Sequence, residues 1–128
     1  PRAVDFPARQ LPGLHEVMAT ADFVVVTVPG GAENAKLIDA TALAAMKPTG
    51  ILVNIARGEV VDEAALIDTL ERRAIAGAGL DVYEKEPFVP ERLRALENCV
   101  LLPHLGSATV ETRQAMAQMA LDNIIAFD

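Results

Sequence analysis

Two short segments of almost uninterrupted apolar residues constrain the fold of this chain more than any other feature. Residues 23–28 read FVVVTV and residues 51–55 read ILVNI, so neither segment alternates between apolar and polar side chains. A strand with one face in water alternates, whereas a strand of a parallel sheet that is covered on both faces does not. Residues 78–83 and 99–102 are two further β-rich runs. The chain is therefore expected to form a parallel sheet.

Helical patterns separate these runs. The expected helices are residues 15–21, 32–46, 62–73, 90–96 and 109–127. The last one carries a single apolar stripe, which predicts a face packed into the core. Its members are Met116, Met119, Ala120, Asn123, Ile124 and Phe127. Strands that alternate with helices indicate an α/β fold, a Rossmann-like parallel sheet with right-handed crossovers.

Composition excludes several classes of protein. A hydrophobic share of 52% in 128 residues is enough for one core, and the net charge of −7 argues against a nucleic-acid partner. No apolar run approaches a membrane span, and no secretory signal opens the chain. Cys99 is the only cysteine, so a reducing, cytoplasmic compartment is expected. We interpret Cys99 as a small buried hydrophobe rather than a nucleophile.

Reactive side chains follow the strands. Arg57 comes after the second run, Asp81 and Glu86 come at or beyond the end of the third, and His104 follows the fourth. Ligands of open parallel sheets bind at the carboxyl ends of the strands, so these side chains are expected to converge. Arg57 would hold a carboxylate, His104 would move a proton, and Glu86 would stabilise the imidazolium. This set suits the reduction of an anionic 2-oxo acid.

Each residue also has an ordinary structural explanation. Arg57 would serve equally as a surface ion-pair partner, and His104 as the cap of the next helix. Gly58 would let the backbone approach a ligand closely. Asp81 is the least ordinary, because a carboxylate within an apolar run must find hydrogen-bond partners. The joint pattern carries the interpretation, and no single residue does.

Three motifs resemble the signatures of the D-isomer-specific 2-hydroxyacid dehydrogenases. They are residues 54–66 (NIARGEVVDEAAL), 79–87 (GLDVYEKEP) and 103–109 (PHLGSAT). The resemblance implies hydride transfer between NAD(P)H and a 2-oxo acid such as glyoxylate or hydroxypyruvate. It also implies that Arg57 orients the substrate, that His104 is the acid/base, and that Glu86 is the carboxylate partner of His104.

The same resemblance implies NAD or NADP as cofactor and no metal ion. Asp81 is similar to the aspartate that contacts the nicotinamide carboxamide. The implied cofactor-binding residues are Val28, Pro29, Ile55, Ala56, Arg57, Asp81, His104, Gly106 and Ser107. The residues that distinguish NAD from NADP are not identified in this sequence, so both cofactors stay open.

The sequence departs from the family in more than one respect, and residues 30–34 (GGAEN) differ from the family's usual threonine-bearing loop. No Gly-x-Gly-x-x-Gly turn, which cradles the pyrophosphate, occurs in it. We therefore expect residues 1–128 to be the C-terminal portion of an NAD(P)-binding domain, without the first glycine-rich βαβ unit and without a substrate domain. Alone, this portion is expected to bind cofactor weakly and to be inactive.

Two other functions stay open at this point. Corepressors of the C-terminal-binding-protein type share the resemblance, and they imply an NAD(H)-sensing scaffold. An inactive fragment is the other alternative. The missing unit would leave an apolar strand exposed at the sheet edge, which predicts self-association, and a homodimer is expected.

Overall fold

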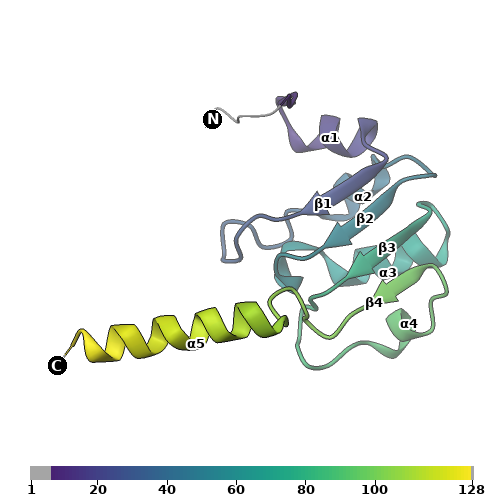
Figure 1. The fold of residues 1–128 in the computed structure, drawn as a ribbon. Helices are drawn as coiled ribbons and strands as arrows, with labels where there is room; N and C mark the ends of the chain where they lie inside the picture. Colours follow the sequence, from purple (N-terminus) through teal and green to yellow (C-terminus); the bar gives the residue numbers. More distant parts are fainter. Residues whose placement is uncertain (1–6, 128) are drawn as a thin grey trace.

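The computed structural model describes residues 7–127, and it shows a four-stranded parallel sheet (Figure 1). The strands are β1 (Phe23–Val26), β2 (Ile51–Asn54), β3 (Gly77–Leu80) and β4 (Cys99–Leu101). The helices are α1 (Leu14–Thr20), α2 (Ala40–Ala44), α3 (Glu63–Glu71), α4 (Glu91–Arg94) and α5 (Val110–Ile125), with a 3-10 turn at Gly58–Val60. The predicted α/β class and the four strands are confirmed, although each strand is shorter than expected.

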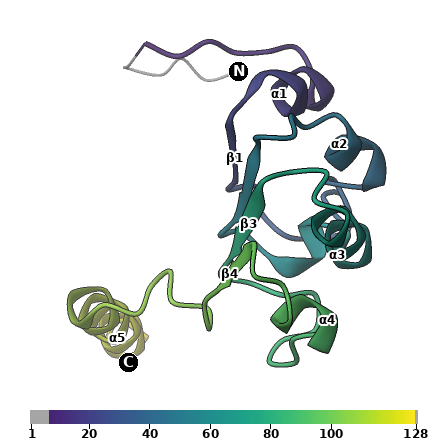
Figure 2. The same cartoon turned by 90° about the vertical axis from the view of Figure 1, so that its right-hand side faces the viewer.

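The strand order is β1-β2-β3-β4, so each strand pairs with its neighbour in sequence. Crossovers of one hand that always step in the same direction place their helices on the same face of a sheet. Figure 2 shows this arrangement, with α2, α3 and α4 on one side of the strands. The carboxyl ends of all four strands therefore lie along one edge.

The core lies between the sheet and these helices. Alternate strand residues face it, and they are buried: Val24, Val26, Leu52, Ala78 and Leu80. Helix residues that complete the core include Leu43, Leu66, Leu70 and Leu93. Opposite residues of the strands face away, and there Phe23 is 65% and Val100 is 64% exposed. The sheet thus has one covered face and one open apolar face.

The predicted helix over residues 32–46 is wrong in its first half. Only α2 forms, and it begins after Asp39, whose side chain accepts a hydrogen bond from the Ala42 N–H at 2.8 Å. The preceding segment pairs with the chain beyond β2 instead: the Lys36 N–H donates to the Glu59 carbonyl, and Ile38 forms a parallel bridge with Val61. Tertiary pairing therefore overrides the helix propensity of this alanine-containing segment.

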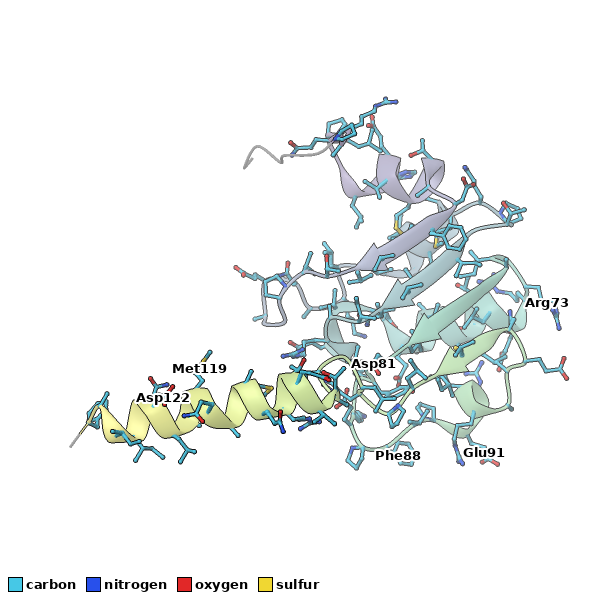
Figure 3. All side chains as sticks on the ribbon, in the orientation of Figure 1. Arg73, Asp81, Phe88, Glu91, Met119 and Asp122 are labelled. Carbon is cyan, nitrogen blue, oxygen red and sulfur yellow. The ribbon has the colours of Figure 1, made fainter. Side chains whose placement is uncertain are left out.

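The predicted burial of the last helix is also wrong. α5 is helical, and the Thr109 side chain caps it, but none of its residues is buried. The helix leaves the sheet and extends away from it, with Met119 and Asp122 both pointing outward (Figures 1 and 3). Met116 and Met119 are 53% and 66% exposed, so they are not core residues. Among the described residues nothing packs against the apolar stripe of α5.

The other predicted helices are confirmed. α3 and α4 lie within their predicted ranges, and α1 begins one residue before its predicted range. Asp62 caps α3 by accepting a hydrogen bond from the Ala65 N–H at 3.1 Å. No helix among the described residues is long and apolar enough to cross a membrane.

Candidate active site

Four loops meet at the carboxyl edge of the sheet, one after each strand. A cleft of about 290 Å³ opens between three of their segments. It is lined by Arg57, Gly58, Glu59, Tyr83, Glu84, Glu86 and His104. The three predicted catalytic residues, Arg57, Glu86 and His104, therefore lie together, although they come from different loops. Convergence of this kind is what parallel strands produce.

His104 and Glu86 form a direct pair. The His104 Nδ1 lies 2.8 Å from Glu86 Oε2, and the other oxygen of Glu86 accepts a hydrogen bond from the Tyr83 N–H at 3.1 Å. The hydrogen bond with His104 is the main cause that lowers the pKa of Glu86, and the positive charge of Arg57 also contributes. Glu86 is therefore ionised at neutral pH, and its carboxylate keeps a proton on Nδ1. The Nε2 atom of His104 is left for proton transfer.

The backbone of His104 is in the left-handed region, with φ of 56°. This conformation is uncommon for a residue other than glycine, and it needs support from its surroundings. Asp81 supplies that support, because its two carboxylate oxygens accept hydrogen bonds from the N–H groups of Leu105 at 2.6 Å and Gly106 at 2.9 Å. Asp81 is only 5% exposed, and Figure 3 shows it where the strand ends meet the start of α5.

Asp81 lies one residue beyond β3 rather than inside it, and its partners are the ones a buried carboxylate needs. Both oxygens bind the loop that carries His104. The sequence interpretation assigned Asp81 to the cofactor, and the structure adds that it holds the His104 loop.

Arg57 makes no ion pair with any described residue. Its guanidinium Nη1 donates to the carbonyl of Ala56 at 2.7 Å. The loop that carries it is fixed by Asn54, which is 1% exposed and whose amide bonds both the Ala56 N–H and the Arg57 carbonyl at 3.0 Å. Arg57 is thus a cation on a rigid loop, with its charge available to an anion.

Asn54 is a functional residue of the first motif that the sequence alone does not identify. A polar residue as the last of four strand residues, after three apolar ones, is the signal that would have identified it. Its side chain forms hydrogen bonds with the Ala56 N–H and the Arg57 carbonyl, two backbone groups that have no strand partner beyond the end of β2.

Gly58 allows a close approach, but to the chain itself. A Cβ at this position would collide with the backbone of Tyr83 and Glu84. The approach of this backbone to a ligand stays a prediction, and the structure adds that the glycine brings the Arg57 loop against the loop after β3. The Tyr83 hydroxyl extends this packing by donating to the Leu102 carbonyl at 2.8 Å, which joins the loops after β3 and β4.

The residues predicted to bind cofactor occupy the same edge. Ile55 is 52% exposed, Val28 is half-buried, and Pro29 is exposed, whereas the side chain of Ala56 is buried in the core. Gly106 is exposed and Ser107 is half-buried, and both follow His104 on the loop after β4. The exposed side chains of Ile55 and Pro29 are apolar, which suits contact with a flat ring.

The chain offers residues suited to the nicotinamide ring of a dinucleotide, but not a turn suited to its pyrophosphate. Ile55 and Pro29 are exposed apolar residues that follow β2 and β1, and apolar side chains of this kind line sites that hold a ring. A glycine-rich turn for the pyrophosphate is not found in the sequence. Among residues 7–127, no three His, Cys, Asp or Glu side chains are grouped so that they could hold a metal ion.

Comparison with known proteins agrees with this site. The family model described as "D-isomer specific 2-hydroxyacid dehydrogenase, NAD binding domain" matches residues 3–106. A glyoxylate reductase of Pyrococcus furiosus is 54% identical over 114 residues, which cover 89% of this chain and 34% of the relative. Glyoxylate/hydroxypyruvate reductase B of Serratia proteamaculans is 52% identical over 88% of this chain and 35% of the relative.

Solved structures have the same fold. The NADPH-dependent glyoxylate/hydroxypyruvate reductase of Sinorhizobium meliloti, in complex with NADP and malonate, aligns with a TM-score of 0.87 at 44% identity. The alignment covers 97% of this chain and 40% of that one. The chain thus spans about a third of the length of the curated relatives it matches. On its sequence, its sheet and its structural neighbours, the chain belongs to the NAD-binding domain of the D-isomer-specific 2-hydroxyacid dehydrogenases.

Proposed function

We propose that this chain supplies the catalytic edge of an enzyme that transfers a hydride between NAD(P)H and a 2-oxo acid. The observation that carries the proposal is the His104–Glu86 pair at 2.8 Å in the same cleft as Arg57, which has no ion-pair partner among the described residues. Relatives named glyoxylate reductase and glyoxylate/hydroxypyruvate reductase make a small 2-oxo acid the favoured substrate class.

Each side chain has one task in this reaction. Arg57 binds the carboxylate of the 2-oxo acid, because a guanidinium matches a carboxylate in charge and shape. In the reductive direction, His104 gives the proton on Nε2 to the carbonyl oxygen, and in the oxidative direction it takes the hydroxyl proton. Glu86 keeps the ring oriented and stabilises the imidazolium. The nicotinamide, when bound, supplies or accepts the hydride.

The cofactor-binding residues are Val28, Pro29, Ile55, Ala56, Arg57, Asp81, His104, Gly106 and Ser107. Ile55 and Pro29 offer exposed apolar surface, while Ala56 would contribute through its backbone only, since its side chain is buried. Residues 1–128 would then form the C-terminal portion of the cofactor domain. The choice between NAD and NADP is set by residues outside this set.

The proposal is tested on the full-length protein that carries this chain, with glyoxylate or hydroxypyruvate and NADPH or NADH. We expect His104→Ala to lower kcat by about 10²- to 10⁴-fold, the usual contribution of general acid–base catalysis. Arg57→Ala is expected to raise the KM for the 2-oxo acid, with little change in the KM for the cofactor. Arg72→Ala, an exposed arginine at the end of α3, is the matched control. Full turnover in both site variants would refute the assignment, and an NADH-dependent partner interaction that survives His104→Ala would favour a scaffold.

We further propose a homodimer and a cytoplasmic location. The open sheet face and the unpacked stripe of α5 are apolar surfaces of a kind that proteins cover by association. One cysteine suits a reducing compartment. Light scattering of the full-length protein measures the first, and a monomer at micromolar concentration would contradict it.

A further inference from the structure

The loop after β1, residues 27–39, is fastened to the segment after β2 by Glu59. The Gly31 N–H donates to Glu59 Oε1 at 2.6 Å, and the Lys36 N–H donates to the Glu59 carbonyl at 2.8 Å. Glu59 therefore holds this loop with its side chain and with its backbone. It stands two residues after Arg57 and lines the same cleft.

Gly30 is the point at which the loop touches the catalytic arginine. A Cβ at Gly30 would lie 2.7 Å from Glu59 Oε1 and 2.9 Å from Arg57 Cγ. Both distances are shorter than Cβ atoms in proteins tolerate, so a methyl group there would have to displace both side chains. The backbone of the loop thus rests directly against the aliphatic stem of Arg57.

The loop is shaped to make this contact. Gly31 has φ of +114°, a conformation that glycine adopts without strain. The Asn34 side-chain amide donates to the Pro29 carbonyl at 3.0 Å, which braces the turn from within. With the turn closed, the Gly31 N–H is aimed at the Glu59 carboxylate.

We propose that Glu59 and Gly30 are positioning residues for Arg57. Glu59 acts through Gly31: it pins the loop against the Arg57 stem, and the contact at Gly30 limits where the guanidinium can go. An arginine side chain has several rotatable bonds, and a restrained one loses less freedom when it binds an anion. This inference rests on the proposed function only in that Arg57 is taken to bind the substrate carboxylate.

Glu59 carries the same charge as the proposed substrate, so its role is separable from simple attraction. If the hydrogen bond from the Gly31 N–H is what matters, the amide oxygen in Glu59→Gln accepts it equally well and substrate binding is kept. If the negative charge beside Arg57 is what matters, Glu59→Gln binds the substrate as weakly as Glu59→Ala.

The experiment compares Glu59→Ala, Glu59→Gln and Gly30→Ala in the full-length protein. Glu33→Ala is the matched control, since Glu33 lies in the same loop, is exposed, and makes no hydrogen bond or ion pair among the described residues. Steady-state kinetics with glyoxylate and NADPH give KM and kcat for each variant. Hydrogen exchange followed by mass spectrometry reports the protection of a peptide that spans residues 28–36.

We expect Glu59→Ala and Gly30→Ala to raise the KM for glyoxylate about 10- to 100-fold, the size of a small misplacement of a binding group. The kcat and the KM for NADPH should change by less than about threefold. Glu59→Gln should restore KM to within about threefold of the parent, and Glu33→Ala should leave it unchanged. Exchange of the 28–36 peptide should rise in Glu59→Ala and return to the parent rate in Glu59→Gln.

Three results would overturn the inference. They are an unchanged KM in Glu59→Ala, a Glu59→Gln variant as impaired as Glu59→Ala, and a loss of kcat, cofactor affinity and thermal stability together. Should the parent protein reduce no 2-oxo acid, the proposed function fails by itself. The exchange measurement still decides whether Glu59 fastens the loop.

Discussion

Replacement of Asp81 by asparagine tests whether a buried carboxylate holds the His104 loop. The two oxygens of Asp81 accept from Leu105 N at 2.6 Å and from Gly106 N at 2.9 Å. Asparagine keeps one acceptor, but its NH₂ group would face the second backbone N–H. One bond is then lost and two donors oppose each other.

The expected cost follows from these contacts. A hydrogen bond to a charged group contributes about 1.5–3 kcal/mol net. The left-handed backbone of His104 adds strain of about 1–3 kcal/mol that the two bonds now offset. Leu105 is 47% exposed, so water replaces part of what is lost. We therefore expect Asp81→Asn to lower the free energy of unfolding by roughly 2–3 kcal/mol.

Urea unfolding followed by circular dichroism measures this quantity. With a slope of about 1–3 kcal/mol per molar, the midpoint should fall by roughly 0.7–3 M. Asp122→Asn, on the exposed side of α5 (Figure 3), is the control and should change stability by less than about 0.5 kcal/mol. A loss below about 0.5 kcal/mol in Asp81→Asn would refute the reasoning, because the carboxylate would then not be holding the loop.

Three further predictions concern Cys99, Gly58 and Glu86. Burial raises the pKa of Cys99 to about 11, so iodoacetamide should label it slowly at pH 8 and rapidly once urea unfolds the protein; equal rates would contradict this. Gly58→Ala should force the Arg57 loop away from Tyr83 and lower both stability and turnover, and a variant with parental melting temperature and activity would show that the contact is dispensable. The pKa of Glu86 is lowered chiefly by the hydrogen bond with His104, so its contribution to stability is present above the ordinary carboxyl pKa and lost as the pH falls through the lower folded value. Glu86→Gln should therefore cost up to about 1 kcal/mol near pH 6 and less toward pH 3, measured by thermal unfolding; a pH-independent cost would refute the linkage.

The local sequence was sufficient to predict the structure where a pattern is compatible with only one kind of element. The apolar runs predicted four parallel strands, and Asp62 with the residues after it predicted α3 to within one residue of its start. The position of Arg57, Glu86 and His104 after successive strands predicted one shared site, because parallel strands bring their carboxyl ends to one edge.

Where a sequence pattern is compatible with several tertiary partners, the local sequence did not determine the structure. Residues 32–38 favour a helix on their own, yet they pair with the chain after β2, and Lys36 adopts a φ of 53° there. The stripe of α5 predicts a buried face, but an amphipathic helix buries it only where a surface is present to receive it. In the described part of the chain there is none.

The sequence by itself determined the class of sheet, the order of its elements and the types of side chain at its reactive edge. Only the tertiary structure decided how those side chains are held: Asp81 under the His104 loop, Gly58 against Tyr83, and Glu59 on the Gly31 N–H. The physical reason is distance along the chain. Periodicity reports on neighbours a few residues apart, whereas Glu59 and Gly31 are joined across 28 residues and Asp81 and Leu105 across 24.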